Sequence, residues 1–177
     1  MKKDSEKKRL FRNGLNYITD LSGDENMEKG VKKIYNIERS LYLKKIPVLP
    51  KIVKMLIRVI CSATIPYSCQ IGYGTVFPHG AQGVVIHEEA VIGERCKIQC
   101  NSVIGGKSGR PGAPKIGNNV LIGAGAAVLG DITIGNNVAI GANAVVVKSV
   151  PDNAVVVGIP GKIIRYLKEG ESSEGEF

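Results

Sequence analysis

The chain repeats every six residues from position 65 onward. A branched aliphatic residue or a close substitute recurs at thirteen positions, and the residue four places later is usually small or aliphatic. Two intervals are longer, nine residues after Phe77 and twelve after Ile104, which indicates loops inserted into a repeat that keeps its register. The thirteen positions are Ile65, Ile71, Phe77, Ile86, Ile92, Ile98, Ile104, Ile116, Ile122, Val128, Ile134, Ile140 and Val146.

A period of six is typical of the hexapeptide parallel β-helix, in which each six residues form one flat face and one corner of a triangular coil. The aliphatic residue points inward and stacks on its equivalent one coil away, and the smaller residue also faces inward because the prism is narrow. Corners need backbone conformations that Gly and Asn tolerate best. The chain is therefore predicted to be mainly β, with corners at Asn118, Asn119, Asn136, Asn137 and Asn143.

Composition agrees with a thin aliphatic core. Of 177 residues, 44% are hydrophobic, only 5% are aromatic and none is Trp. No apolar run reaches 18 residues and no leader with a cleavage site is visible, so we expect a cytoplasmic protein. Cys69 and Cys96 occupy small inward positions, which favours buried thiols over a disulfide or a metal site. With only two histidines, a zinc site of three imidazoles cannot be built, and no metal is expected.

The positive charge lies in the N-terminal part of the chain. Residues 1–63 carry fifteen basic and seven acidic residues, whereas the remainder carries nine of each. We expect a basic, partly helical extension over 1–63, a β-helix over 64–158, and a C-terminal helix with a polar tail over 159–177. The best-defined helix of the extension is predicted at 50–61, after a polar and mobile start.

The helix at 50–61 is basic and amphipathic, and it is too short and too charged to span a bilayer. Its apolar face either caps the open first coil of the β-helix or touches an anionic membrane surface, and the two roles are compatible. Nucleic-acid binding is disfavoured because no aromatic residues interleave with the basic ones.

Of the two histidines, His79 is the candidate for chemistry. It lies in the first inserted loop, where Pro and Gly residues lead the chain away from the coil, and imidazole is a suitable general base near neutral pH. The alternative is a surface histidine in a turn. His87 lies inside a regular repeat just after an inward residue, so its side chain is expected to face solvent.

Several segments resemble serine acetyltransferases of the left-handed β-helix superfamily, in order and in spacing, over roughly residues 62–165. The resemblance implies a left-handed coil and transfer of an acetyl group from acetyl-CoA to a small-molecule hydroxyl acceptor, with His79 as the catalytic base. It also implies a homotrimer in which acetyl-CoA lies between neighbouring β-helices. The segments are 74–86, 104–109, 114–117, 122–126, 140–144 and 157–162.

The same resemblance assigns the cofactor contacts. Gly106, Ala124 and Ala142 would line the pantetheine groove, while Lys162 and Arg165 would meet the phosphates of CoA. Backbone N–H groups of the turn at Gly105 and Gly106 are candidates to stabilise the oxyanion. Without the resemblance, the alanines would be read as corner packing and Lys162 as a solvated charge.

The chain departs from the serine enzymes on the acceptor side. Thr64 stands where they have an aspartate, Pro78 where they have an acidic residue, and Gly112 and Ala113 where they have Arg and His. Those charged groups are expected to hold an amino acid, so the acceptor is either serine or a sugar hydroxyl of a polysaccharide precursor. Arg110 is a candidate to replace the missing arginine.

Two further expectations come from these departures. The tyrosines Tyr67 and Tyr73 either form a wall for a neutral acceptor or pack under the N-terminal helix. The extension is shorter than that of the serine enzymes, which favours one trimer over a dimer of trimers. The alternative to an enzyme is a catalytically silent β-helix that binds CoA or serves as a scaffold.

Overall fold

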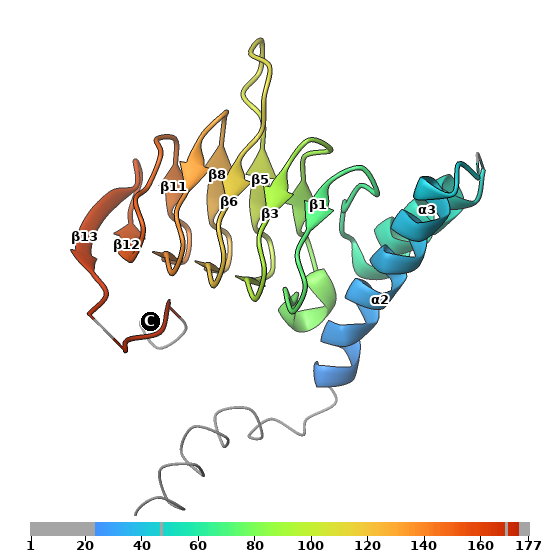
Figure 1. The fold of residues 1–177 in the computed structure, drawn as a ribbon, viewed down its shortest axis with the longest axis horizontal. Coiled ribbons are helices and arrows are strands. Elements are labelled where there is room, and N and C mark those ends of the chain that lie inside the picture. The colour runs from blue at the N-terminus through green and yellow to red at the C-terminus, as the bar shows by residue number, and fades with distance from the viewer. Residues whose placement is uncertain (1–23, 47, 169, 174–177) are drawn as a thin grey trace, which may run out of the picture.

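The computed structural model describes residues 24–46, 48–168 and 170–173. Two helices at one end lead into a coil of short parallel strands, and the last strand closes the opposite end (Figure 1). The polar start expected before residue 24 and the last residues of the polar tail lie outside the described residues. The repeat of six is confirmed as a β-helix with three faces.

Each face of the coil is a sheet of parallel strands, apart from the antiparallel β13 at the end of one sheet, and is named here after its first strand. Paired strands place each inward residue on its equivalent one coil away, for example Ile86 on Ile104 and Ile104 on Val128. The β1 face contains β1 (Gln70–Ile71), β3 (Val91–Ile92), β6 (Lys115–Ile116) and β9 (Thr133–Ile134). The β2 face contains β2 (Val85–Ile86), β5 (Val103–Gly105), β8 (Ala127–Leu129) and β11 (Val145–Val146). The β4 face contains β4 (Lys97–Ile98), β7 (Leu121–Ile122), β10 (Ala139–Ile140), β12 (Ala154–Val157) and β13 (Lys162–Tyr166).

The core follows the sequence prediction. The inward aliphatic residues are buried except for Ile71, which is partly buried in the first coil, and Cys69 and Cys96 fill small inward positions with no exposed surface. Corner asparagines adopt positive φ, as at Asn119 and Asn137. Their side chains also join successive coils, because Asn119 Nδ2 donates to Asn137 Oδ1 at 3.0 Å and Asn137 Nδ2 donates to Asn153 Oδ1 at 3.1 Å.

The first coil is capped by α2 (Asp24–Leu43), a helix absent from the sequence prediction. Its Tyr35 is fully buried and donates a hydrogen bond to the Cys69 carbonyl at 2.7 Å, and Lys32 Nζ donates to the Ile71 carbonyl at 3.0 Å. These bonds satisfy carbonyls at the open end of the coil, and Arg39 Nη1 of the same helix also donates to the Cys69 carbonyl.

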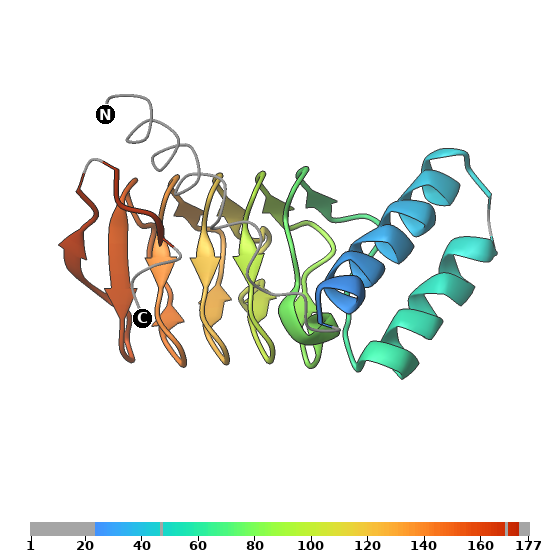
Figure 2. The same ribbon diagram turned by 90° about the horizontal axis from the view of Figure 1, so that it is seen from below.

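The predicted helix at 50–61 exists as α3 (Leu49–Cys61), but the expectation that its apolar face caps the coil is wrong. Figure 2 shows α2 beside the first coil and α3 on the far side of α2. From α3, Ile57 reaches the buried core. The buried row at Pro50, Ile57 and the half-buried Val53 takes only one side of α3, because α2 already occupies the end of the coil.

The predicted C-terminal helix is also wrong. Residues 162–166 form β13, which pairs antiparallel with β12. A strand is favoured here because Ile163 and Ile164 are β-branched and because β12 would otherwise present an unpaired edge. Leu167 then packs on the outward side chains of Ala139 and Val155. Within the described part of the chain, no helix has the length and apolar character needed to cross a membrane.

Candidate active site

His79 lies in a short 3₁₀ turn, η1 (Pro78–Ala81), between the β4 face and the β2 face of the first coil. Three consecutive residues of this turn have positive φ: His79 at 55°, Gly80 at 66° and Ala81 at 59°. Side-chain-bearing residues adopt this region at a cost of about 1–2 kcal/mol each. The turn buries Pro78 and Ala81 and leaves His79 exposed. Such backbone strain in an exposed histidine is typical of functional positions.

The His79 side chain borders a cavity of about 360 Å³ between η1 and the two helices. Its wall is largely apolar, and no Asp, Glu, Lys or Arg is among its lining residues. Burial raises the pKa of the Cys61 thiol in this wall, so the thiol stays neutral. The cavity is lined by Gly30, Val31, Ile34, Ile60, Cys61, Ser62, His79, Gly80 and Gln82.

The corner that begins at His79 continues up the coil, and we call it the His79 edge. Asn101 N donates to the Gln82 carbonyl at 2.8 Å, and Asn143 N donates to the Ala124 carbonyl at 2.9 Å. The small side chains of Ala124 and Ala142 lie on this edge, where Ala124 is half-buried and Ala142 is exposed. The edge is therefore lined by small residues above His79.

The other corner of the β2 face, which we call the loop edge, carries the second insertion. Gly105 and Gly106 open the insertion, and the loop protrudes from the coil between β5 and β6 (Figure 1). A β-carbon on Gly106 would lie 3.3 Å from His87 Nε2 and 3.1 Å from the Gly112 carbonyl oxygen. His87 is thus half-buried against the base of this loop instead of facing solvent, and Arg110 is exposed near the loop tip.

The structure therefore divides the predicted site into two groups. His79, Ala124 and Ala142 lie on the His79 edge, whereas Gly106 and Arg110 lie on the loop edge. Within one chain the width of the β2 face separates the groups. The expectation that Gly106 lines one groove with the two alanines is not met inside a single chain.

The remaining acceptor candidates lie at the first coil. Thr64 is half-buried and pairs with β2, accepting a hydrogen bond from Ile86 N at 2.8 Å. Pro78 is buried under η1 and is not among the residues that line the His79 cavity. Tyr67 packs under the helices, with its ring centroid 4.7 Å from that of Tyr42, and Tyr73 is 86% exposed at another corner. Neither tyrosine lines the His79 cavity.

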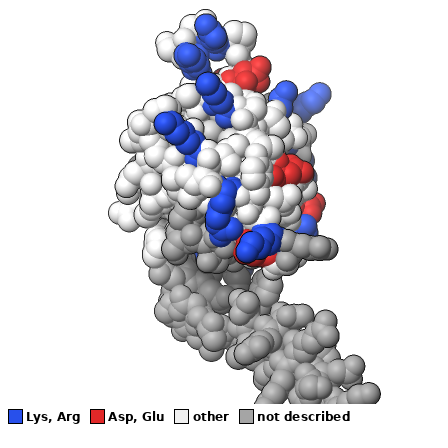
Figure 3. Space-filling view, turned by 90° about the vertical axis from the view of Figure 1, so that its left-hand side faces the viewer, with Lys and Arg blue, Asp and Glu red and all other residues white. Residues whose placement is uncertain are grey.

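Of the two basic candidates, Lys162 lies opposite Val157 at the far end of the His79 edge, whereas Arg165 lies opposite Val155 within the β4 face. Lys162 begins β13 and is exposed. Arg165 Nη1 donates to Glu171 Oε2 at 2.9 Å. The hydrogen bond from Lys168 N to the same carboxylate, and then the bond from Arg165, lower the pKa of Glu171 below its usual value. Figure 3 shows Lys and Arg side chains from the top to the bottom of this end of the molecule, with largely uncharged surface and a few acidic side chains between them.

The apolar cavity wall was missed at the sequence level because α2 was missed. The signal was present, since Val31, Ile34, Tyr35 and Glu38 recur at helical spacing and the helix begins at Asp24. Glu38 interrupts the apolar pattern. It is nevertheless fully buried, and burial raises its pKa to about 7 although the charge of Lys54 opposes the shift.

Comparisons with known proteins agree with this geometry. Residues 113–148 match the bacterial transferase hexapeptide family, described as six repeats. A serine acetyltransferase of Synechococcus elongatus is 37% identical over 155 residues, covering 86% of this chain and 61% of the relative. The solved serine acetyltransferase of Neisseria gonorrhoeae has a TM-score of 0.74 at 36% identity, over 78% of this chain and 54% of that one. This chain contains hexapeptide repeats and is similar to serine acetyltransferases.

A second solved relative, from Brucella abortus, is a serine acetyltransferase in complex with coenzyme A, with a TM-score of 0.73 at 32% identity over 77% of this chain and 55% of that one. The gonococcal enzyme has also been solved in complex with serine. The chain spans between about half and two thirds of the length of these relatives. The left-handed β-helix with a short helical N-terminal part is confirmed.

Proposed function

We propose that this protein is an O-acetyltransferase that moves an acetyl group from acetyl-CoA to the hydroxyl of a small-molecule acceptor. The position of His79 carries the proposal, because it borders the uncharged cavity and also begins an edge of small residues that leads toward basic side chains. Relatives named serine acetyltransferases, one of them solved with coenzyme A, support the choice of reaction and cosubstrate.

In the proposed reaction, His79 removes the proton from the acceptor hydroxyl as its oxygen attacks the thioester carbonyl. The tetrahedral oxyanion is stabilised by backbone N–H groups, with Gly105 and Gly106 as the candidate source. Collapse of this intermediate breaks the carbon–sulfur bond, and the leaving CoA thiolate takes up the proton. The products are an acetyl ester and free CoA, and no covalent enzyme intermediate is required.

The CoA arm is proposed to lie along the His79 edge. From Gln82 to Gly158 this edge rises by four coils, about 19 Å at the usual spacing between paired strands. The small side chains of Ala124 and Ala142 leave room for the thioester arm, and Lys162 at the far end is placed to meet phosphate. Arg165 is a weaker candidate because Glu171 already engages its guanidinium.

The active site is proposed to be completed by a neighbouring copy in a homotrimer. The outward residues of the β2 face are all aliphatic and at least partly exposed, whereas the β1 face has Gln70, Lys115 and Thr133 beside Val91. A partly exposed aliphatic row favours contact with another chain. Association through this face brings the His79 edge of one copy to the loop edge of the next, including Gly106 and Arg110. The outward row is Val85, Val103, Ala127 and Val145.

The acceptor is proposed to bind in the cavity beside His79. A zwitterion placed there would lose hydration without gaining opposite charges from the described lining residues, whereas a neutral polyhydroxyl needs only hydrogen bonds and an apolar wall. Thr64 lies near this end of the coil, and Arg110 of a neighbouring copy is the candidate for any anionic group. The proposal divides the chain into an acceptor-side extension (1–63), the acyltransferase coil (64–158) and a closing segment (159–177), in a cytoplasmic enzyme.

The test is the release of free CoA from acetyl-CoA in the presence of serine, homoserine and a panel of sugars. We predict turnover with a neutral sugar hydroxyl and a serine KM above about 1 mM, the upper end of the usual range. A serine kcat/KM above about 10⁴ M⁻¹s⁻¹ would show that Arg110 or another group restores amino-acid recognition. If no acceptor releases CoA although CoA binds, the chain is the silent CoA-binding protein instead.

A further inference from the structure

The outer face of α3 is apolar, and none of the residues that the structure describes covers it. Pro50 and Ile57 face α2, which leaves the opposite side of the helix in solvent. On this outer side the exposure rises from 49% at Ile52 and Leu56 to 67% at Met55, 69% at Val59 and 71% at Ile60. At 100° per residue these five side chains fall within one continuous arc of the helix. Single exposed apolar residues are ordinary, but a contiguous face marks an interaction surface.

Basic residues border this face and acidic residues are absent. Lys51 and Arg58 are exposed on the flank of α3 beside the apolar arc, and Lys44 and Lys45 are exposed at the turn from α2. Residues 39–63 contain six basic residues and no acidic one. The outer face of α3 is therefore an apolar surface bordered by positive charge.

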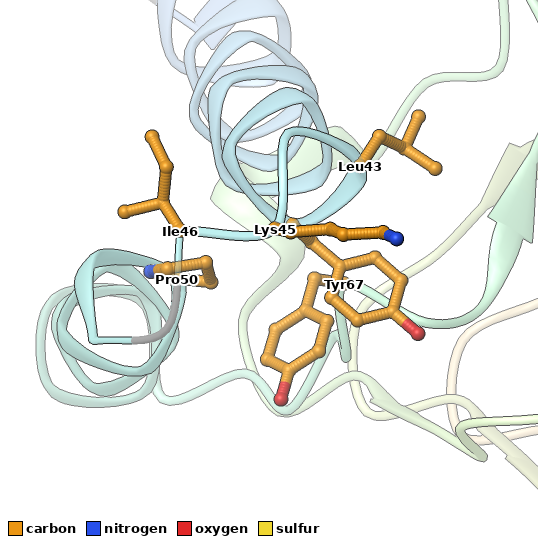
Figure 4. Close-up of a pocket in the computed structure, with 6 residues that line it drawn as sticks. Leu43, Lys45, Ile46, Pro50 and Tyr67 are labelled. Carbon is orange, nitrogen blue, oxygen red and sulfur yellow. The ribbon is translucent and has the colours of Figure 1, made fainter.

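The turn at the start of α3 adds aromatic residues to the same end of the molecule. Tyr42, Lys45 and Tyr67 line a cavity of about 410 Å³ together with aliphatic side chains at the α2–α3 turn (Figure 4). Tyrosine rings with a polar tip are typical of membrane interfaces, where apolar and hydrated regions meet.

Two partners could cover such a face, a second copy of this chain or a lipid surface, and the charge of the face favours the lipid surface. A second copy docked on this face would bring its own Lys and Arg residues against those of the first, and like charges across a desolvated contact are repulsive. An anionic lipid surface supplies opposite charge to the basic flank and an apolar layer for the outer face.

We propose that α3 lies in the headgroup region of an anionic lipid bilayer, with Met55, Val59 and Ile52 directed into the apolar layer and Lys51 and Arg58 toward the phosphates. This inference does not depend on the proposed acetyl transfer. Ile60 belongs both to the outer face and to the wall of the His79 cavity, so docking would bring the entrance of that cavity to the lipid surface.

The test is co-sedimentation of the full-length protein with vesicles of phosphatidylcholine, with and without phosphatidylglycerol, at low and at high salt. We expect binding only to the anionic vesicles, with binding weakened by salt because the attraction is screened. Replacing both Met55 and Val59 with Glu, or both Lys51 and Arg58 with Glu, should weaken partitioning by more than about tenfold. Tyr73→Glu is the control, since it introduces one negative charge at an exposed position away from α3 and should leave partitioning nearly unchanged.

Each alternative gives a different result. Equal partitioning of the parent and both α3 variants would overturn the proposal and assign any binding to another part of the chain. Failure of the parent to bind anionic vesicles at low salt would also overturn it. If Met55→Glu with Val59→Glu instead lowers the mass of the assembly in light scattering, this face is a contact between copies and not a lipid surface.

Discussion

At the scale of single residues, the backbone of η1 explains why the side chain of His79 lies outside the coil. In the strands of the coil, side chains alternate between the core and the surface. The positive φ values at His79 and Ala81 turn the chain so that Pro78 and Ala81 fill the core. His79 can then reach the cavity without disturbing the stacking of inward residues. Its role should therefore be separable from stability.

Replacing His79 with Ala should lower turnover by about 10² to 10⁴, the usual contribution of a positioned acid or base, and leave the affinity for CoA unchanged. Steady-state CoA release and CoA titration measure the two effects separately. His87→Asn is the comparison, because an Asn side chain keeps an acceptor for the Glu89 N–H that His87 Nδ1 now accepts at 3.2 Å. If His87→Asn is inactive and His79→Ala is not, the assignment of the base is reversed.

Glu38 gives a prediction on stability. Its two carboxylate oxygens have no hydrogen-bond partner among the described residues, and burial raises its pKa to about 7 from an ordinary value of 4.5. The Glu38 carboxyl of the folded protein therefore stays protonated over a pH range in which the same carboxyl of the unfolded chain is ionised. Stability should fall as pH rises from about 4.5 to about 7, by about 1.4 kcal/mol for each unit of pKa difference.

Glu38→Gln removes this loss while keeping the shape of the side chain. The melting temperature of the variant should exceed that of the parent at pH 8, and the difference should shrink toward pH 4.5. Lys54→Met is a second check, because it removes the charge that lowers the Glu38 pKa. In this variant the loss of stability should extend to higher pH and be larger in total than in the parent. A difference between Glu38→Gln and the parent that does not change with pH would contradict the account.

At the scale of elements, the coil depends on close approach of backbones at its corners. A β-carbon on Gly117 would lie 2.8 Å from the carbonyl carbon and oxygen of Gly135, and backbone cannot move aside as a flexible side chain can. Gly117→Ala should destabilise the protein by about 1–3 kcal/mol. Gly30→Ala in α2 meets nothing within 4 Å and should stabilise it by about 1 kcal/mol through helix propensity. Chemical denaturation measures the free energy of unfolding of both variants. If Gly117→Ala does not lower it, the backbones at the corners are not as closely packed as the account requires.

The elements also show which features the sequence could predict. The aliphatic period of six and the Asn corners were predicted correctly because each inward position is repeated from coil to coil, so a single pattern is tested many times. The C-terminal strand was not predicted, because residues 162–166 are a strand only where β12 offers an unpaired edge. The helix α2 was missed because Glu38 breaks its apolar row, although that carboxylate is buried.

Prediction of the candidate site had a similar limit. The inserted loop around His79 was visible as an interval of nine residues, so the place where the histidine leaves the coil was predictable from sequence. The cavity beside it was not, because its wall comes from α2 and α3, which are distant in sequence from η1. Gly106 and Ala124 lie on different edges because the corners that contain them are on opposite sides of the β2 face. The family resemblance alone did not predict this separation.

At the scale of the whole molecule, the two edges of the β2 face determine which lesions can complement each other. His79 and Ala124 share the His79 edge, whereas Gly106 lies on the loop edge. If each site combines the His79 edge of one copy with the loop edge of the next, a chain damaged on one edge still contributes an intact second edge. Lesions on different edges should therefore complement in mixed trimers, and lesions on the same edge should not.

The most direct measurement is CoA release by mixed trimers, after unfolding and joint refolding of equal amounts of two inactive variants and confirmation of trimers by light scattering. His79→Ala with Gly106→Trp should regain about one quarter of the parental activity, since every mixed trimer then contains one site with both edges intact. His79→Ala with Ala124→Trp should stay inactive, because every site then has a damaged His79 edge. Recovery by the second pair and not by the first, or a monomeric protein with full activity, would contradict the shared site.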